Sequence, residues 1–80
     1  MNRDCLDVYN DFPQYHAQID FLTENNRRFN RLCSQYRRVV YQLHRVGKAS
    51  ERSSNEESKM LDTMRRGLKS ELFMMLQSHH

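Results

Sequence analysis

Apolar residues recur at spacings of three and four along the first half of this chain, and little interrupts them. The series consists of Phe12, Tyr15, Ile19, Leu22, Phe29, Cys33, Tyr36, Val40 and Leu43. This spacing places the side chains on one side of an α-helix, as in coiled coils. Only one proline and two glycines occur in 80 residues, so residues that favour turns are scarce. The pattern predicts one long helix over residues 12–46, with Asp11 and Gln14 spaced as a capping box at its start and Gly47 at its end.

A second helix is predicted over residues 55–78. Ser54 and Glu57 also have the spacing of a capping box, and the serine-rich residues before them are expected to form the loop. The apolar side of this second helix is formed by Leu61, Met64, Leu68, Leu72 and Met75. Gly67 lies inside it and should cost roughly 1 kcal/mol relative to alanine.

The two helices predict an all-α fold, an antiparallel two-helix hairpin. Residues 1–10 are expected to form a flexible or short helical N-terminal arm, and residues 11–78 a single helical-hairpin domain. At 1.5 Å per residue the first helix is about 52 Å long and the second about 36 Å, so the second leaves the beginning of the first uncovered.

A second copy of the chain can cover that apolar end by forming a four-helix bundle. A chain of 80 residues buries a limited core, and such small proteins often depend on association. We therefore expect a homo-oligomer, most simply a dimer. The residues expected to carry the self-association are Phe12, Tyr15, Ile19, Leu22, Asn26, Phe29 and Leu32. Asn26 fills the gap between Leu22 and Phe29 in the apolar series. A single polar residue at such a position commonly sets the register or the oligomeric state of a coiled coil. In the alternative, the N-terminal arm folds back over this end.

Composition excludes several classes of protein. No apolar run approaches the roughly 18 residues of a membrane-spanning helix, and the N-terminus has no apolar signal-peptide core. Two cysteines, Cys5 and Cys33, are too few for a disulfide framework and are expected to be reduced thiols. The sequence therefore predicts a cytoplasmic protein that does not bind membranes.

Charge is strongly segregated along the chain, although the net charge is only +3. Residues 1–26 hold one basic and five acidic side chains, whereas residues 27–52 hold eight basic and one acidic. On the predicted first helix Arg31, Arg38 and Arg45 form a row with about 10.5 Å between neighbours. With Arg27 and Lys48 beside it, this row is a candidate polyanion-binding site. The alternative is a solvated outer face that keeps the protein soluble or meets acidic partners.

Catalytic, cofactor and metal sites are not expected. Cys33 lies on the apolar series and is more typical of a small buried side chain than of a nucleophile. No spacing of cysteine and histidine resembles a zinc site, and His79 and His80 can bind metal only weakly as a pair. No glycine-rich phosphate loop or catalytic motif occurs.

Several of these residues resemble the YdcH-like family of small bacterial proteins, a domain of unknown function. The resemblance covers residues 12–46 and 57–76. It is carried by Phe12-Pro13-Gln14-Tyr15, Ile19, Leu22, Asn26, Phe29 and Leu32, and later by Leu68-Lys69-Ser70-Glu71-Leu72 and Met75-Leu76. It implies an antiparallel helical hairpin that self-associates and implies no reaction. The residues before Phe12, the serine-rich loop and Gly67 depart from the family pattern.

These patterns favour a non-enzymatic, self-associating protein-interaction module, such as a small cytosolic adaptor or regulator with an unknown protein partner. The alternative function is nucleic-acid or other polyanion binding through the basic outer face of the first helix.

Overall fold

A computed structural model describes residues 5–49 and 55–78, with side chains for residues 5–45 and 56–78. Every regular element in these ranges is helical, which confirms the all-α prediction. In chain order they are α1 (Leu6–Asp11), the short 3-10 helix η2 (Pro13–Tyr15), α2 (His16–Asn25), α3 (Arg27–Ala49) and α4 (Asn55–Ser78).

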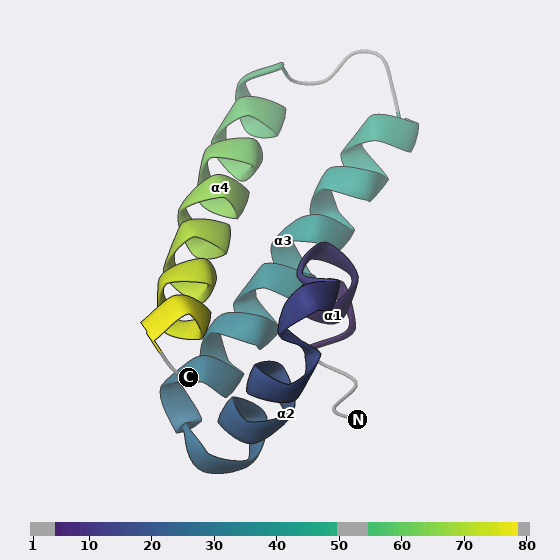
Figure 1. The fold of residues 1–80 in the computed structure, drawn as a ribbon. Helices are drawn as coiled ribbons and strands as arrows, with labels where there is room; N and C mark the ends of the chain where they lie inside the picture. The colour runs from purple at the N-terminus through teal and green to yellow at the C-terminus, as the bar shows by residue number, and fades with distance from the viewer. Residues whose placement is uncertain (1–4, 50–54, 79–80) are drawn as a thin grey trace.

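The two longest helices, α3 and α4, lie side by side and run in opposite directions (Figure 1). The predicted bounds of the second helix are confirmed, because α4 spans Asn55–Ser78. Its Leu61, Leu72 and Leu76 are buried. Gly67 lies on the exposed side of α4, and a Cβ atom there would meet nothing within 4 Å. No close approach of another described element therefore requires a glycine at position 67.

The prediction of one long helix over residues 12–46 is wrong, because the chain is interrupted inside this range and the last helix ends later than residue 46. The chain is extended at Asn26, with φ −136° and ψ 110°, and this residue separates α2 from α3. The side-chain Oδ1 of Asn26 accepts a 3.0 Å hydrogen bond from the backbone N–H of Phe29, as an N-cap residue does. The polar residue in the apolar series therefore begins a helix. At the other end α3 continues through Gly47 to Ala49.

The predicted capping boxes have different outcomes. Asp11 is the last residue of α1, and no side chain caps the start of η2 or α2. The Asp11–Gln14 capping box is therefore wrong. The predicted cap at Ser54 and the loop before it lie outside the described residues, as do residues 1–4 and His79 and His80.

The segment before Asn26 folds back over the α3–α4 pair (Figure 1). Within this segment Leu6–Asp11 is helical, and Cys5 and Val8 are completely buried in the same core as Phe29 and Leu72. Cys33 is buried in it too, as predicted. The described residues of the expected arm therefore belong to the main core.

The apolar end that was expected to be exposed is covered within one chain. Five of the seven predicted self-association residues are buried, namely Phe12, Ile19, Leu22, Phe29 and Leu32. Tyr15 is half-buried against them, and Asn26 is half-buried. The predicted exposed edge is wrong, because α1 and α2 supply the cover that a second copy was expected to supply.

Polar and aromatic contacts hold this folded-back segment in place. The Tyr9 hydroxyl donates a hydrogen bond to Asp20, and the buried Tyr36 hydroxyl donates one to Asp11 at the end of α1. The ring of Phe12 stacks on Phe73 of α4, with 5.9 Å between ring centroids. These contacts join α1 to α2 and α3, and the residue after α1 to α4.

Candidate binding surface

The predicted arginine row lies on the outer surface of α3. Arg27, Arg31, Arg38 and Arg45 are all exposed. At 100° per residue they fall within about 40° of one another on the helix. The side chain of Lys48, the fifth predicted residue, lies outside the described residues. As a whole α3 contains seven basic residues and no acidic one.

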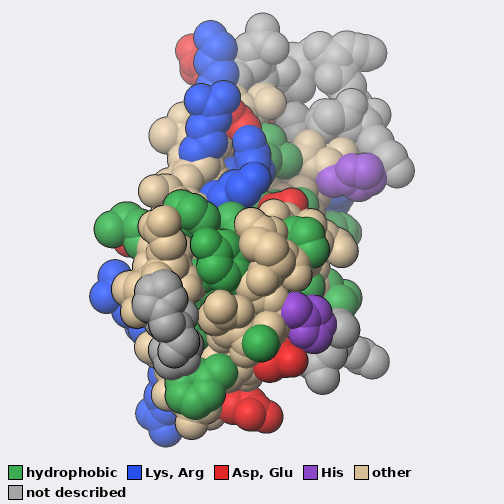
Figure 2. Space-filling view, viewed as in Figure 1, with side chains coloured by type: hydrophobic (Ala, Val, Ile, Leu, Met, Phe, Trp, Pro, Cys, Tyr) green, Lys and Arg blue, Asp and Glu red, His purple; other side chains and the backbone are tan. Residues whose placement is uncertain are grey.

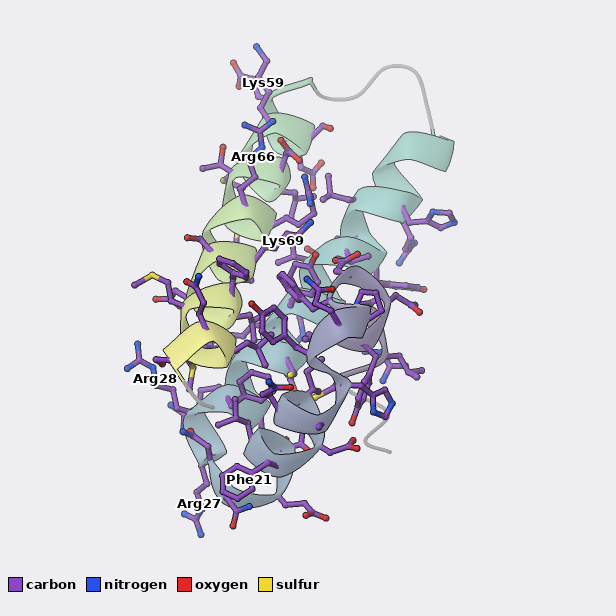
Figure 3. The ribbon with its side chains drawn as sticks, viewed as in Figure 1. Phe21, Arg27, Arg28, Lys59, Arg66 and Lys69 are labelled. Atoms are coloured by element: carbon purple, nitrogen blue, oxygen red, sulfur yellow. The ribbon has the colours of Figure 1, made fainter. Side chains whose placement is uncertain are left out.

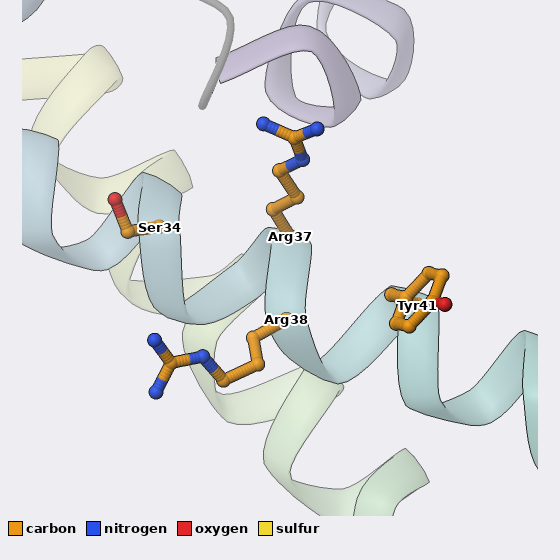
Figure 4. A pocket seen from close by; sticks show the side chains of 4 residues that line it. All are labelled: Ser34, Arg37, Arg38 and Tyr41. Carbon is orange, nitrogen blue, oxygen red and sulfur yellow. The ribbon is translucent and has the colours of Figure 1, made fainter.

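The arginines of α3 differ in their partners. Arg28 forms a 3.9 Å ion pair with Glu71 of α4, and the Arg45 guanidinium lies 5.9 Å from the centroid of the Tyr41 ring. Arg37 points toward α1, whereas Arg38 points to the other side of α3 (Figure 4). Among the described side chains, no carboxylate forms an ion pair with Arg31 or Arg38. These two charges are therefore available to a partner.

Arg37 is tied electrostatically to α1. Burial and the neighbouring Asp11 raise the pKa of Asp7, and the positive charge of Arg37 opposes this rise. Arg37 therefore contributes to the contact between α3 and α1, and it is also exposed on the surface.

A groove of about 390 Å³ opens between α3 and α4. Its lining consists of Gln35, Arg38, Val39, Gln42, Met64 and Leu68. Tyr36 and Arg37 turn toward α1, so the groove residues on α3 lie on the side away from α1. The groove thus has an apolar floor, with Arg38 and two amide side chains along its α3 edge.

Methionines extend the apolar surface along α4. Met60, Met64 and Met74 fall within about 80° of one another on the helix, with Gly67 between them. They are 59%, 47% and 63% exposed. Met64 was predicted to lie on the apolar core side of this helix, but it lines the groove instead. Methionine side chains are flexible and polarizable, so such a surface can adapt to different apolar shapes.

A second hollow, of about 450 Å³, lies on the other side of Arg38. It is lined by Ser34, Arg37, Arg38 and Tyr41 (Figure 4). Tyr41 is 59% exposed. Arg38 therefore borders two depressions, an apolar one toward α4 and a polar one with an aromatic ring.

The acidic side chains gather on the folded-back segment. Residues 5–25 contain four acidic residues and no lysine or arginine. Figure 2 shows acidic side chains over α1 and α2, whereas basic and acidic ones occur together along α4. Phe21 of α2 is 46% exposed and lies near the junction with α3, close to Arg27 (Figure 3). The charge segregation of the sequence thus becomes a segregation between two sides of the molecule.

The described part of the chain has neither a cluster of metal-binding side chains nor a membrane-spanning helix. Within residues 5–49 and 55–78, no three His, Cys, Asp or Glu side chains gather closely enough to hold a metal ion. None of the helices in these ranges is long and apolar enough to cross a bilayer. Cys5 and Cys33 are both completely buried.

The arginine row was predicted from the sequence, whereas the groove was not. One signal for the groove was present, because Val39 belongs to a second apolar stripe beside the main series. Phe21 also gave a signal, since it is a large apolar residue outside the series, between Asp20 and Glu24. Neither signal identifies the opposite wall of a groove, which α4 provides.

Comparisons of the chain with models of protein families, with curated proteins and with solved structures found no match. The resemblance to the YdcH-like family therefore stays a prediction, carried by the residues named above.

Proposed function

We propose that this protein is a non-catalytic interaction module whose α3–α4 groove binds an acidic amphipathic helix of a protein partner. The observation that carries this proposal is the pairing of an apolar groove floor with an acid-free basic helix. Helices commonly bind proteins by laying their apolar side into such a groove.

The chemistry of the groove favours an acidic partner. An apolar stripe on the partner can cover Val39, Met64 and Leu68, while its acidic residues meet Arg38 and the rest of the row. Two acids of α4 pair with other basic side chains, because Asp62 pairs with Arg65 and Arg66, and Glu71 pairs with Arg28. Opposite charges across the interface would favour association and exclude basic partners.

A designed peptide can test this proposal. The probe is a fluorescein-labelled helical peptide of 18 residues with leucines at i, i+3, i+4 and i+7, glutamates beside them and alanines elsewhere. We expect Met64→Asp to weaken binding about tenfold or more, because an unpaired charge would be buried in the interface. Arg38→Glu should weaken it comparably through like-charge repulsion. Fluorescence anisotropy measures both affinities.

Two controls make the result specific. Met74→Asp places the same charge on an exposed methionine of α4 that does not line the groove, so it should weaken binding much less than Met64→Asp. A peptide of equal composition with scrambled leucine positions should bind weakly. Equal binding of the ordered and scrambled peptides would contradict a helix-binding groove.

A second candidate function, polyanion binding, is favoured by a different observation. The arginine row runs beside a hollow that contains Ser34 and the exposed ring of Tyr41. Single-stranded nucleic acids are commonly bound by positive charges along the phosphates and by aromatic rings that stack on the bases.

A further inference from the structure

We infer that a second copy of this chain occupies the groove, with Phe21 of α2 inserted between α3 and α4 of its neighbour. This inference rests on the proposed function, because it names the helix that the same groove binds. It replaces the predicted self-association through Phe12 and the other core residues, which are used inside one chain.

The exposed side of α2 has the chemistry that the groove requires. Ala17, Phe21 and Glu24 are spaced by four and three, so they share one side of the helix, and all three are exposed. Asp20 lies beside them, although its carboxylate also accepts a hydrogen bond from Tyr9 and lies 3.4 Å from His16. An aromatic ring flanked by carboxylates is therefore presented to solvent.

The two surfaces complement each other in shape and charge. A groove of about 390 Å³ with Val39, Met64 and Leu68 on its floor can accept a phenylalanine ring. A buried aromatic anchor commonly supplies much of the energy of an interface. Glu24 would then lie near Arg38, and the acidic α1–α2 side of one copy would face the basic α3 of the next.

The contact would be head to tail. Phe21 lies at the junction of α2 and α3, whereas the groove lies farther along α3, between Gln35 and Gln42, on the side away from α1. Different surfaces of the two copies would therefore meet, so one copy would keep an open groove and the other an exposed Phe21 for a further copy. Such contacts build rings or open chains. The expected product is a concentration-dependent series larger than a dimer, weakened by salt because charges are paired across it.

Sedimentation velocity of the full chain tests this arrangement. Phe21→Asp and Met64→Asp should each reduce association about tenfold or more, leaving monomers at concentrations where the wild-type chain assembles. An equimolar mixture of the two variants should form a heterodimer that grows no further, because one variant retains the groove and the other retains Phe21. Leu6→Asp is the matched control, since Leu6 is 43% exposed but lies neither on α2 nor in the groove, so it should reduce assembly far less than either variant.

A charge exchange repeats the test with polar, exposed positions, where folding is less affected. Glu24→Lys and Arg38→Glu should each weaken assembly. Mixing them should restore an alternating series, because the reversed pair forms at one contact and the original Glu24–Arg38 pair forms at the next. Far-ultraviolet circular dichroism checks that each variant is folded.

Three outcomes would overturn the inference. One is a wild-type chain that stays monomeric at every concentration, and another is a mixture of Phe21→Asp and Met64→Asp that remains monomeric. The third is an assembly that Met64→Asp abolishes and Phe21→Asp leaves intact; the groove would then bind a different segment, and the proposed function would stand. Failure of the groove itself is measured separately by the glutamate–leucine peptide.

Discussion

Tyr36 is a single residue that joins three helices. It is buried on α3, its hydroxyl donates a hydrogen bond to Asp11 of α1, and it also interacts with Arg65 of α4. Burial first, and then the bond to Asp11, raise the pKa of Tyr36 to about 12. The sequence places this tyrosine on the apolar series but does not reveal its polar partners.

The raised pKa predicts a loss of stability at alkaline pH. The folded-state pKa of Tyr36 exceeds the unfolded value near 10, so this stabilisation is complete below pH 10 and is lost as the pH rises through about 12. A pKa difference of two units corresponds to at most about 2.7 kcal/mol in the free energy of unfolding. We expect Tyr36→Phe to lower stability by about 1 kcal/mol at pH 8 and to flatten the decline above pH 10.

Urea unfolding between pH 8 and pH 12 measures this effect. Tyr41→Phe is the control, because Tyr41 is exposed and lies outside the core. The pKa of Tyr9 is also raised by burial and by its bond to Asp20, so some decline should remain in every variant. Parallel curves for the wild type and Tyr36→Phe would rule out the proposed role of Tyr36.

At the scale of the elements, the break at Asn26 determines where the first half of the chain lies. The sequence predicts the period of the helix correctly, but the apolar series continues on both sides of this residue. Asparagine is tolerated inside a helix and is favoured at its N-cap, so local preference leaves both states open. The extended conformation at Asn26 lets α2 fold back onto α3, which buries Ile19 and Leu22.

Loss of this cap should destabilise the protein. We expect Asn26→Ala to cost about 1 kcal/mol, because the N–H of Phe29 loses its acceptor. Asn26→Asp should retain most of the stability, since a carboxylate also caps and suits the positive end of the helix. Chemical denaturation of the three proteins gives the comparison.

Asn25→Ala is the neighbouring control. Asn25 is exposed and bonds only locally to the Phe21 carbonyl, so its replacement should cost less than about 0.5 kcal/mol. If Asn25→Ala were as costly as Asn26→Ala, the cap would not be the source of the effect.

At the scale of the whole molecule, folding turns a charge pattern along the sequence into two differently charged sides. The acidic α1 and α2 lie on one side of α3, and the arginine row lies on its outer surface. The row could be predicted because its spacing is a local property of one helix. The groove beside it could not, because its second wall comes from α4.

The second candidate function makes its prediction at this scale. If the row binds single-stranded DNA, replacing Arg31, Arg38 and Arg45 with alanine should lower the slope of log affinity against log salt by about 2. Anisotropy of a fluorescein-labelled 20-nucleotide strand between about 50 and 200 mM salt measures this slope.

Lys59, Arg66 and Lys69 provide the matched control, because they also form a basic group, on α4 (Figure 3). Their replacement with alanine removes the same charge and should change the slope less. An equal change in both triple variants would show that binding follows net charge and does not depend on the row.

The sequence by itself determined the helical class, the extent of α4 and the exposure of the arginine row, because each follows from residue spacing within one helix. The tertiary structure decided whether the apolar end of the first half was covered by the same chain or by another. Both arrangements satisfy the same periodic pattern, so periodicity cannot separate them. Covering Phe12 and Ile19 within one chain avoids the entropy lost when two molecules associate. This arrangement leaves the groove and Phe21 exposed. We propose that the protein binds its partners through these two surfaces.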